Sequence, residues 1–379
     1  MPTQANKAQL VRELALAAGF DEAGVAILEP LEGVEGDRLR AWLDDERQGS
    51  MAYMARDPGR RLDPGVVLPG ARSILCVALN YGNRHRGGRG KNGAGRVARY
   101  AWGRDYHKVF SRRLKRLEEM LADEFPGVRT RRYVDTGPVM EKLWAERAGL
   151  GWRGKHTNLL SRNWGSWLLL GEVLLDLELE PDSPATDHCG QCTRCIDVCP
   201  TRAITGPYQL DARLCISYLT IEHRGTIPKE LRPLMGDHVF GCDDCLDVCP
   251  WNRFARNARE AEFKPRPEVM APLLVELVTL GDEGFLGRFA GTALMRPKRD
   301  GMARNACIAL GNVGGPGAVE ALGRALEDAS PLVREHAAWG LGRLGDGAAL
   351  EVLQRARETE ADPDVLATID EALDASLPG

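Results

Sequence analysis

Cysteine spacing constrains this 379-residue chain more than any other feature, because eight of its ten cysteines lie within residues 189–249. The first run reads Cys-x-x-Cys-x-x-Cys-x-x-x-Cys-Pro, and the second reads Cys-x-x-Cys-x-x-x-Cys-Pro, with one more cysteine between them. In the ferredoxin pattern, the fourth cysteine of a run binds the other of two clusters, and each four-iron cluster takes four thiolates. The sequence therefore predicts two 4Fe–4S clusters and the transfer of single electrons.

The spacing also predicts which thiols share a cluster. The first cluster takes Cys189, Cys192, Cys195 and Cys249. The second takes Cys199, Cys242 and Cys245 and needs a fourth ligand. A regular second run would place this ligand at position 239, where the chain has Val239, so we assign the remaining thiol, Cys215.

Zinc is the main alternative, since paired Cys-x-x-Cys motifs also form zinc sites. Zinc does not require the full four-cysteine run that ends in proline, so the ferredoxin interpretation is favoured. Disulfides are disfavoured by the clustering and by a polar N-terminus without an apolar signal segment. Cys76 and Cys307 lie in apolar surroundings and are expected to be buried structural thiols.

Composition places the chain among folded proteins, with 44% hydrophobic and 27% charged residues. No apolar run is long enough for a membrane helix, so we expect a cytoplasmic protein with no membrane contact. The net charge is −4, yet residues 84–116 hold twelve Lys or Arg and one acid, Asp105. Such a stretch suits phosphate binding, although a solvated loop and helix face would look the same.

Three domains are expected. Residues 1–180 alternate between helical patterns at 9–18, 38–45 and 107–124 and strand-like patterns at 21–28, 71–80, 131–134 and 167–177, which indicates an α/β domain. Another helix is expected to start near Pro138. Residues 83–96 form a Gly- and Arg-rich flexible segment. Residues 181–265 hold the clusters, and residues 266–379 form the third domain.

The third domain contains an internal repeat. Ala306, Leu310, Gly311 and Gly314 correspond to Ala337, Leu341, Gly342 and Gly345 after a shift of 31 residues. In each copy a helix ends at a glycine and a second helix follows, at 318–326 and 348–356. Helical pairs of this kind resemble short HEAT-like repeats, which present a surface; a plain helical bundle is the alternative.

Nucleotide motifs are absent from the sequence. No Gly-x-Gly-x-x-Gly follows a strand, and there is no Gly-x-x-x-x-Gly-Lys-Ser/Thr, so neither a Rossmann site nor a phosphate-binding loop is indicated. The histidines are scattered. His107, within the polar cluster 104–108, is the best functional candidate among them.

Across its length the chain resembles the epoxyqueuosine reductases, iron–sulfur and cobalamin enzymes of tRNA modification related to reductive dehalogenases. The resemblance lies in Leu68-Pro-Gly-Ala-Arg72, Gly103-Arg-Asp-Tyr-His-Lys108, Tyr133-Val-Asp135-Thr-Gly-Pro138, Gly151-Trp152, Gly154-Lys155-His-Thr-Asn158 and Cys249-Pro-Trp-Asn252. It implies a multi-domain α+β protein with a nitroreductase-like α/β domain that holds cobalamin, a double-cluster ferredoxin-like module and helical repeats. It also implies reduction of epoxyqueuosine to queuosine at the wobble position of tRNA.

The resemblance further implies site residues. Asp135 matches the catalytic aspartate of the family and would donate a proton, although Asp before Thr-Gly-Pro is also a good helix N-cap. We expect cobalamin contacts from Tyr106, His107, Lys155 and Asn158, and contacts with tRNA phosphates from Arg296, Lys298, Arg299 and Arg304. An external electron donor and a monomeric chain complete the expectation. The rival classes are an exported reductive dehalogenase, which the polar start disfavours, and a non-catalytic electron carrier.

Overall fold

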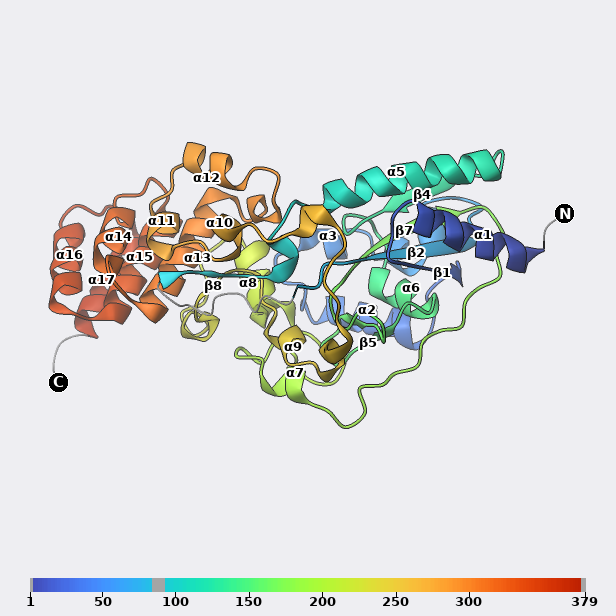
Figure 1. The fold of residues 1–379 in the computed structure, drawn as a ribbon. Coiled ribbons are helices and arrows are strands. Elements are labelled where there is room, and N and C mark those ends of the chain that lie inside the picture. Colours follow the sequence, from blue (N-terminus) through green and yellow to red (C-terminus); the bar gives the residue numbers. More distant parts are fainter. Residues whose placement is uncertain (1–2, 84–92, 376–379) are drawn as a thin grey trace. The chain divides into compact units, whose positions relative to one another are not determined.

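The computed structural model describes residues 3–83 and 93–375, so most of the segment expected to be flexible at 83–96 lies outside the described residues (Figure 1). The chain folds into two compact units. The first comprises residues 1–84, 104–212 and 244–264, and the second comprises residues 85–103, 213–243 and 265–379. The cluster segment at 181–265 thus contributes to both units, and the three-part division of the sequence by function stays a prediction.

A four-stranded antiparallel sheet in the order β1-β2-β7-β4 forms the centre of the first unit. Every residue of β2 is buried, as the apolar run at 71–80 predicts. All four strands coincide with strand-like patterns in the sequence. Their bounds are β1 Glu22–Ile27, β2 Ser73–Asn80, β4 Thr130–Tyr133 and β7 Leu168–Leu175.

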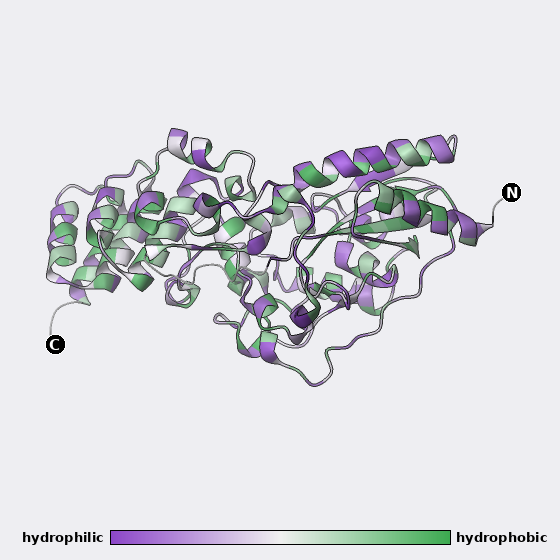
Figure 2. Cartoon of the chain, viewed as in Figure 1, coloured by the Kyte–Doolittle hydropathy of each residue, from purple (hydrophilic) through white to green (hydrophobic). Residues whose placement is uncertain are grey.

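Helices cover both faces of this sheet. The long amphipathic helix α5, Tyr106–Glu124, turns its apolar side to one face, and Figure 2 shows the polar residues along its other side. A Cβ at Gly171 of β7 would lie 2.8 Å from the ring of Phe110, so this glycine permits close approach of α5. On the opposite face, a Cβ at Gly24 would lie 2.0 Å from the carbonyl oxygen of Ala148, at the end of α6.

The remaining elements of the first unit are short, apart from α1 and α2. They are α1 Gln4–Ala17, α2 Val34–Asp44, α3 Ala52–Ala55, α4 Pro58–Leu62, α6 Glu141–Arg147, β5 Trp152–Arg153, β6 Leu159–Leu160, α7 Arg194–Asp197 and α9 Asp244–Asp247. Helices α7 and α9 pack on each other, and each contains the last cysteine before the Cys-Pro pair of its run, Cys195 and Cys245 respectively.

Helices dominate the second unit, beside a short parallel strand pair, β3 and β8. The elements are β3 Arg96–Val97, α8 Ile216–Ile221, β8 His238–Phe240, α10 Pro267–Met270, α11 Leu274–Val278, α12 Asp282–Phe289, α13 Lys298–Val313, α14 Ala318–Ala325, α15 Pro331–Leu344, α16 Gly347–Arg357 and α17 Pro363–Asp374.

The internal repeat forms the predicted helical pairs, α13 with α14 and α15 with α16. Helices α13 and α15 end at Gly314 and Gly345, whose φ angles of 61° and 65° lie in the left-handed region that glycine adopts without strain. A Cβ at Gly311 would lie only 2.7 Å from the Cα of Gly340, so small residues let the first helices of the two pairs approach closely. Close packing of α13 on α15 therefore explains why both copies of the repeat contain a glycine in the first helix.

Both cysteines outside the cluster runs are buried, as expected of structural thiols. Cys76 of β2 is 1% exposed and Cys307 of α13 is fully buried. Burial raises the pKa of each thiol, which keeps both groups neutral. Among the helices of the described residues, none combines the length and the apolar character that crossing a membrane requires.

Candidate active site

Asp135 lies in the loop that connects β4 to α6. Its φ of 55° is in the left-handed region, which is uncommon for a residue with a side chain. Helix α6 begins at Glu141 and has no side-chain capping bond, so the expected start near Pro138 is wrong. The loop instead passes so close to Tyr133 that a Cβ at Gly137 would lie 2.3 Å from its ring, so the close approach needs glycine. Asp135 therefore does not cap the helix, and this alternative interpretation does not hold.

His107, at the start of α5, lies between two carboxylates. Its Nδ1 is 2.8 Å from Oδ1 of Asp105, and its Nε2 is 3.3 Å from Oδ2 of Asp135. Asp105 is the N-cap of α5 and also accepts the backbone N–H of His107, so it fixes the direction of the ring. The ring of Tyr106 stacks on His107 with a centroid distance of 4.1 Å. The structure thus brings Tyr106, His107 and Asp135 together.

Electrostatics favour the protonated form of His107. Burial by itself lowers the pKa of the imidazole, but hydrogen bonds to Asp105 and Asp135 and the charges of both carboxylates outweigh burial and raise the pKa to about 9. At neutral pH His107 therefore carries a proton on each ring nitrogen, one directed at each carboxylate. The side chain of Asp135 is 59% exposed, so this proton-rich group is open to an approaching substrate.

Two further acids lie behind Asp135, and the sequence reasoning missed both. Oε1 of Glu141 accepts the backbone N–H of Asp135. Glu172 is fully buried in the middle of β7. Burial and then the charge of the other acids raise the pKa of both carboxyl groups. One signal in the sequence was available, since Glu172 is the single acid between Trp167 and Leu175 in an apolar run.

The other two candidates for cobalamin contacts are bonded elsewhere. Nζ of Lys155 donates to the carbonyl oxygens of Gly190 and Cys192 at 2.6 and 3.1 Å, so this lysine supports the loop of the first cysteine run. Oδ1 of Asn158 accepts a hydrogen bond from Nζ of Lys142 at 2.8 Å. The next residue to Lys155, His156, is 3% exposed, and its Nε2 has no hydrogen-bond partner among the described residues.

Six of the eight clustered cysteines lie in the first unit, and Cys215 and Cys242 lie in the second. Burial raises the pKa of Cys195 to about 11, and the neighbouring thiols that contribute are Cys189, Cys249 and Cys192. These four thiols are the set predicted for the first cluster, and the structure brings the last cysteine of the second run to the first run. Soft thiolates in this arrangement fit an iron–sulfur cluster.

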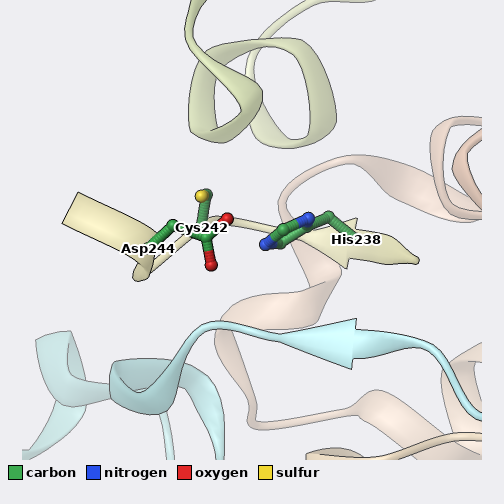
Figure 3. Close-up of side chains that lie close together, drawn as sticks. All are labelled: His238, Cys242 and Asp244. Atoms are coloured by element: carbon green, nitrogen blue, oxygen red, sulfur yellow. The ribbon is translucent and has the colours of Figure 1, made fainter. Parts of the chain in front are cut away.

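Figure 3 shows His238, the first residue of β8, together with Cys242 and Asp244. The possible ligand atoms of His238 and Cys242 lie within 4.8 Å of each other. The ring of His238 is already engaged, because Nδ1 is 2.8 Å from the carbonyl oxygen of Met235 and Nε2 is 3.3 Å from a guanidinium nitrogen of Arg96. We therefore interpret His238 as a satisfied structural histidine and Cys242 as a cluster thiol.

The four candidate tRNA contacts differ in availability. Arg304 is fully buried, and its guanidinium donates to the carbonyl oxygens of Leu219, His223 and Gly225, so assigning it to phosphate was wrong. Arg299 is bound by both oxygens of Asp328. Arg296 and Lys298 are exposed, and Arg296 pairs with Glu222 at 2.9 Å.

The basic stretch of the first unit is also partly neutralised. Arg104 and Arg112 both pair with Glu262, and Arg113 pairs with Glu260. These acids come from a distant part of the chain and complete a charge network along α5. The described part of the stretch is therefore less positive than its sequence suggests.

Three family descriptions match this chain. Residues 61–136 match "Epoxyqueuosine reductase QueG, DUF1730", residues 188–252 match "4Fe-4S double cluster binding domain", and residues 292–374 match "HEAT repeats". These matches cover the predicted cluster segment and the predicted repeats. The double-cluster match favours iron–sulfur clusters over zinc.

Whole-chain comparisons agree with these matches. The chain is 42% identical to an epoxyqueuosine reductase of Xanthomonas campestris over 91% of this chain and 98% of that protein, and 42% identical to that of Escherichia coli over 89% of each. It is also similar to an epoxyqueuosine reductase solved with an epoxyqueuosine-modified tRNA-Tyr stem loop, with a TM-score of 0.90, 32% identity and coverage of 97% and 98%. This chain belongs to the epoxyqueuosine reductase family.

Proposed function

We propose that this enzyme reduces epoxyqueuosine to queuosine at the wobble position of tRNA, with Asp135 as the proton donor to the epoxide oxygen. The proposal depends on one observation: the imidazole of His107, protonated at neutral pH, lies between the carboxylates of Asp105 and Asp135 and contacts one with each ring nitrogen. Family membership supplies the substrate, since a relative has been solved with an epoxyqueuosine-modified stem loop.

The chemistry balances with two electrons and two protons. Both carbon–oxygen bonds of the epoxide break, a carbon–carbon double bond forms, and the oxygen leaves as water. The iron–sulfur clusters deliver electrons singly, whereas the protons must reach an oxygen that becomes negative as its bonds break. A positioned acid lowers that barrier, typically by about 10²–10⁴-fold.

Asp135 and His107 have complementary parts in this proton transfer. Asp135 is the more exposed of the two side chains, at 59% against 33%, so it meets the substrate. His107 holds the proton at neutral pH, because its pKa is raised to about 9. It can return a proton to Asp135 through the contact at Nε2, and Asp105 holds the ring in place for both transfers.

Cobalamin is the cofactor that the family resemblance implies, and when bound it supplies a reduced cobalt centre that passes electrons to the epoxide carbon. Tyr106 and His107 lie beside Asp135 and would contact cobalamin there. The segment around Lys155 and Asn158 also fits, because the buried Nε2 of His156 has no partner among the described residues. Its Nδ1 accepts the N–H of Asn158, so Nε2 is the protonated nitrogen and would suit the oxygen of an amide side chain of cobalamin.

The partners follow from the same assignment. Single-stranded anticodon bases are accessible to a protein, as sequence-specific RNA recognition requires. Arg296 and Lys298 remain the proposed phosphate contacts of the second unit, since both are exposed. An external one-electron donor, a monomeric chain and a cytoplasmic location complete the proposal.

Replacing Asp135 by Asn tests the proposal, with Asp57→Asn, another exposed aspartate before a short helix, as the matched control. We expect turnover of an epoxyqueuosine stem loop to fall about 10²–10⁴-fold in Asp135→Asn, since the amide cannot donate an acidic proton. Iron content, cobalamin content and stem-loop affinity should stay at wild-type levels. Near-normal turnover of Asp135→Asn would refute the proton-donor role.

A further inference from the structure

Glu172 is an unusual residue for the centre of a sheet. It is fully buried, and neither of its carboxyl oxygens has a hydrogen-bond donor among the described residues. Its neighbours across the strands are Cys76 of β2 and Tyr133 of β4. It lies on the face that α6 covers, where the surrounding core is apolar and includes Leu143 and Trp144. An ionised carboxylate without partners is very costly in such a place.

Protonation of Glu172 removes the free-energy cost of burying a charge. Burial, followed by the charges of Glu141 and Asp135, raises the pKa of Glu172 well above its ordinary value. A neutral carboxylic acid has an O–H group and so becomes a hydrogen-bond donor, which an ionised carboxylate is not. Buried acids kept neutral for this purpose are known at enzyme active sites.

We assign Glu141 as the acceptor for this O–H group, because Glu141 is the first residue of α6, which packs on β7, and its carboxyl group raises the pKa of Glu172. Two ionised carboxylates cannot bond to each other, so a proton must lie between them. Oε1 of Glu141 also accepts the backbone N–H of Asp135. Glu141 therefore connects the buried acid to the loop that carries the proposed proton donor.

The loop needs such support. Asp135 has a φ of 55°, and a side-chain-bearing residue keeps this conformation only when its surroundings hold it. Besides Glu141, the side chain of Arg61 reaches the carbonyl oxygen of Gly137 at 3.5 Å. Within the loop, the backbone N–H of Thr136 bonds to the carbonyl oxygen of Val134. The bond from Asp135 to Glu141 acts directly on the backbone N–H of the strained residue.

We propose that Glu172 is a positioning residue, whose carboxylic acid O–H orients Glu141 so that Glu141 holds the backbone of Asp135 in its left-handed conformation. The inference rests on the proposed catalytic role of Asp135. Glu172 does not touch the substrate and does not supply a proton to it. Its proton serves only to make a hydrogen bond.

Two variants of Glu172 separate this role from a structural one. Glu172→Gln keeps an N–H donor directed at Glu141, so kcat should stay within about threefold of wild type. Glu172→Met has similar volume and no donor, so kcat should fall at least about tenfold, since small misplacements of catalytic groups are costly. KM for the stem loop should change little in either variant.

Thermal stability provides the discriminating readout. Replacing a buried acid that accepts no hydrogen bond among the described residues by an apolar side chain is neutral or stabilising, so Tm of Glu172→Met should equal or exceed that of wild type. A lower kcat with an undiminished Tm supports positioning. Wild-type kcat in Glu172→Met, an equal loss in both variants, or a fall of Tm in parallel with kcat would each overturn it.

An infrared measurement does not depend on the Met variant. The difference spectrum between wild type and Glu172→Gln at neutral pH should show the carbonyl band of a buried carboxylic acid, and absence of this band overturns the proposal. Asp135→Asn, measured alongside, separates the two hypotheses. If Asp135→Asn is inactive while Glu172→Met is fully active, only the positioning role fails; if Asp135→Asn is active, the proton-donor role fails.

Discussion

Glu172 in the first unit and Arg304 in the second are both ionisable and both fully buried, yet their surroundings differ completely. The guanidinium of Arg304 donates to the carbonyl oxygens of Leu219, His223 and Gly225, and to the side chain of Asn305. Neither oxygen of Glu172 has a donor among the described residues. One burial is fully compensated and the other is not.

This difference distinguishes a structural from a functional use of a buried ionisable group. Arg304 and Asn305 tie α13 to the backbone of α8 and β8, since Asn305 donates to the carbonyl oxygens of Thr220 and Val239. Such a network stabilises the fold around it. No described residue donates a hydrogen bond to Glu172, and strongly perturbed carboxyl groups gather at functional sites.

The largest expected effect concerns stability. Arg304→Met should lower the free energy of unfolding by about 3–5 kcal/mol, because several buried carbonyl oxygens lose their donor at once. Urea unfolding followed by circular dichroism measures this change, and Glu172→Met is the matched control with no expected loss. If Arg304→Met is as stable as wild type, the hydrogen bonds of Arg304 do not stabilise the second unit, and the proposed difference between Arg304 and Glu172 is contradicted.

The next effect tests the proton-rich side of the active site. Because a raised pKa means that the proton is held until the pH exceeds it, turnover should persist through neutral pH and fall as the pH rises through about 9. Asp105→Asn removes one carboxylate beside His107 but still caps α5. The pKa of His107 should therefore fall, so kcat should decrease at a lower pH than in wild type and be about tenfold lower on the alkaline side of the profile. A pH profile of kcat that is identical in both proteins would contradict the assigned role of His107.

A smaller effect compares a buried histidine in each unit. Burial lowers the pKa of both His156 and His336 to about 4. The unfolded chain then binds more protons than the folded one between about pH 6.5 and 4, so stability is lost as the pH falls through this window. Each histidine should contribute about 1 kcal/mol per pH unit. His336→Gln should reduce the slope of unfolding free energy against pH, and an unchanged slope would contradict its neutral burial.

The two histidines should differ in function. Both ring nitrogens of His336 have partners, with Nδ1 close to the carbonyl oxygen of Leu332 and Nε2 accepting the N–H of Ile227. Nε2 of His156 has none among the described residues. His156→Gln should therefore lower cobalamin content, whereas His336→Gln should leave it unchanged.

The smallest effect concerns tRNA. Arg296→Ala and Lys298→Ala should each weaken stem-loop binding only about two- to fivefold, because exposed phosphate contacts are screened by salt and Arg296 is partly neutralised by Glu222. Glu222→Gln is the matched control and should strengthen binding by releasing Arg296. Fluorescence anisotropy at several salt concentrations measures both changes, and tighter binding after Arg296→Ala would exclude this residue as a phosphate contact.

Cluster motifs, strands and repeats could be predicted from the sequence because each depends on neighbours in the chain. A Cys-x-x-Cys spacing brings thiols to one metal whatever surrounds them, and the run at 71–80 is a buried strand because its own residues are apolar. The shift of 31 residues predicts helical pairs for the same reason. Motifs around Asp135 and His107 indicated the family, and the comparisons confirmed it.

Only the tertiary structure decided how the charged side chains are used. Arg304 looks like a surface arginine in the sequence, but its acceptors lie 79 to 85 residues earlier in the chain. Asp135 fits a capping motif in the sequence, but α6 begins only at Glu141 in the structure. Helix α6 packs on β7, so Glu141 raises the pKa of Glu172, which lies 31 residues later in the chain. Burial and pairing are long-range quantities, and the pKa of a carboxyl group or the availability of an arginine follows from them rather than from its local sequence.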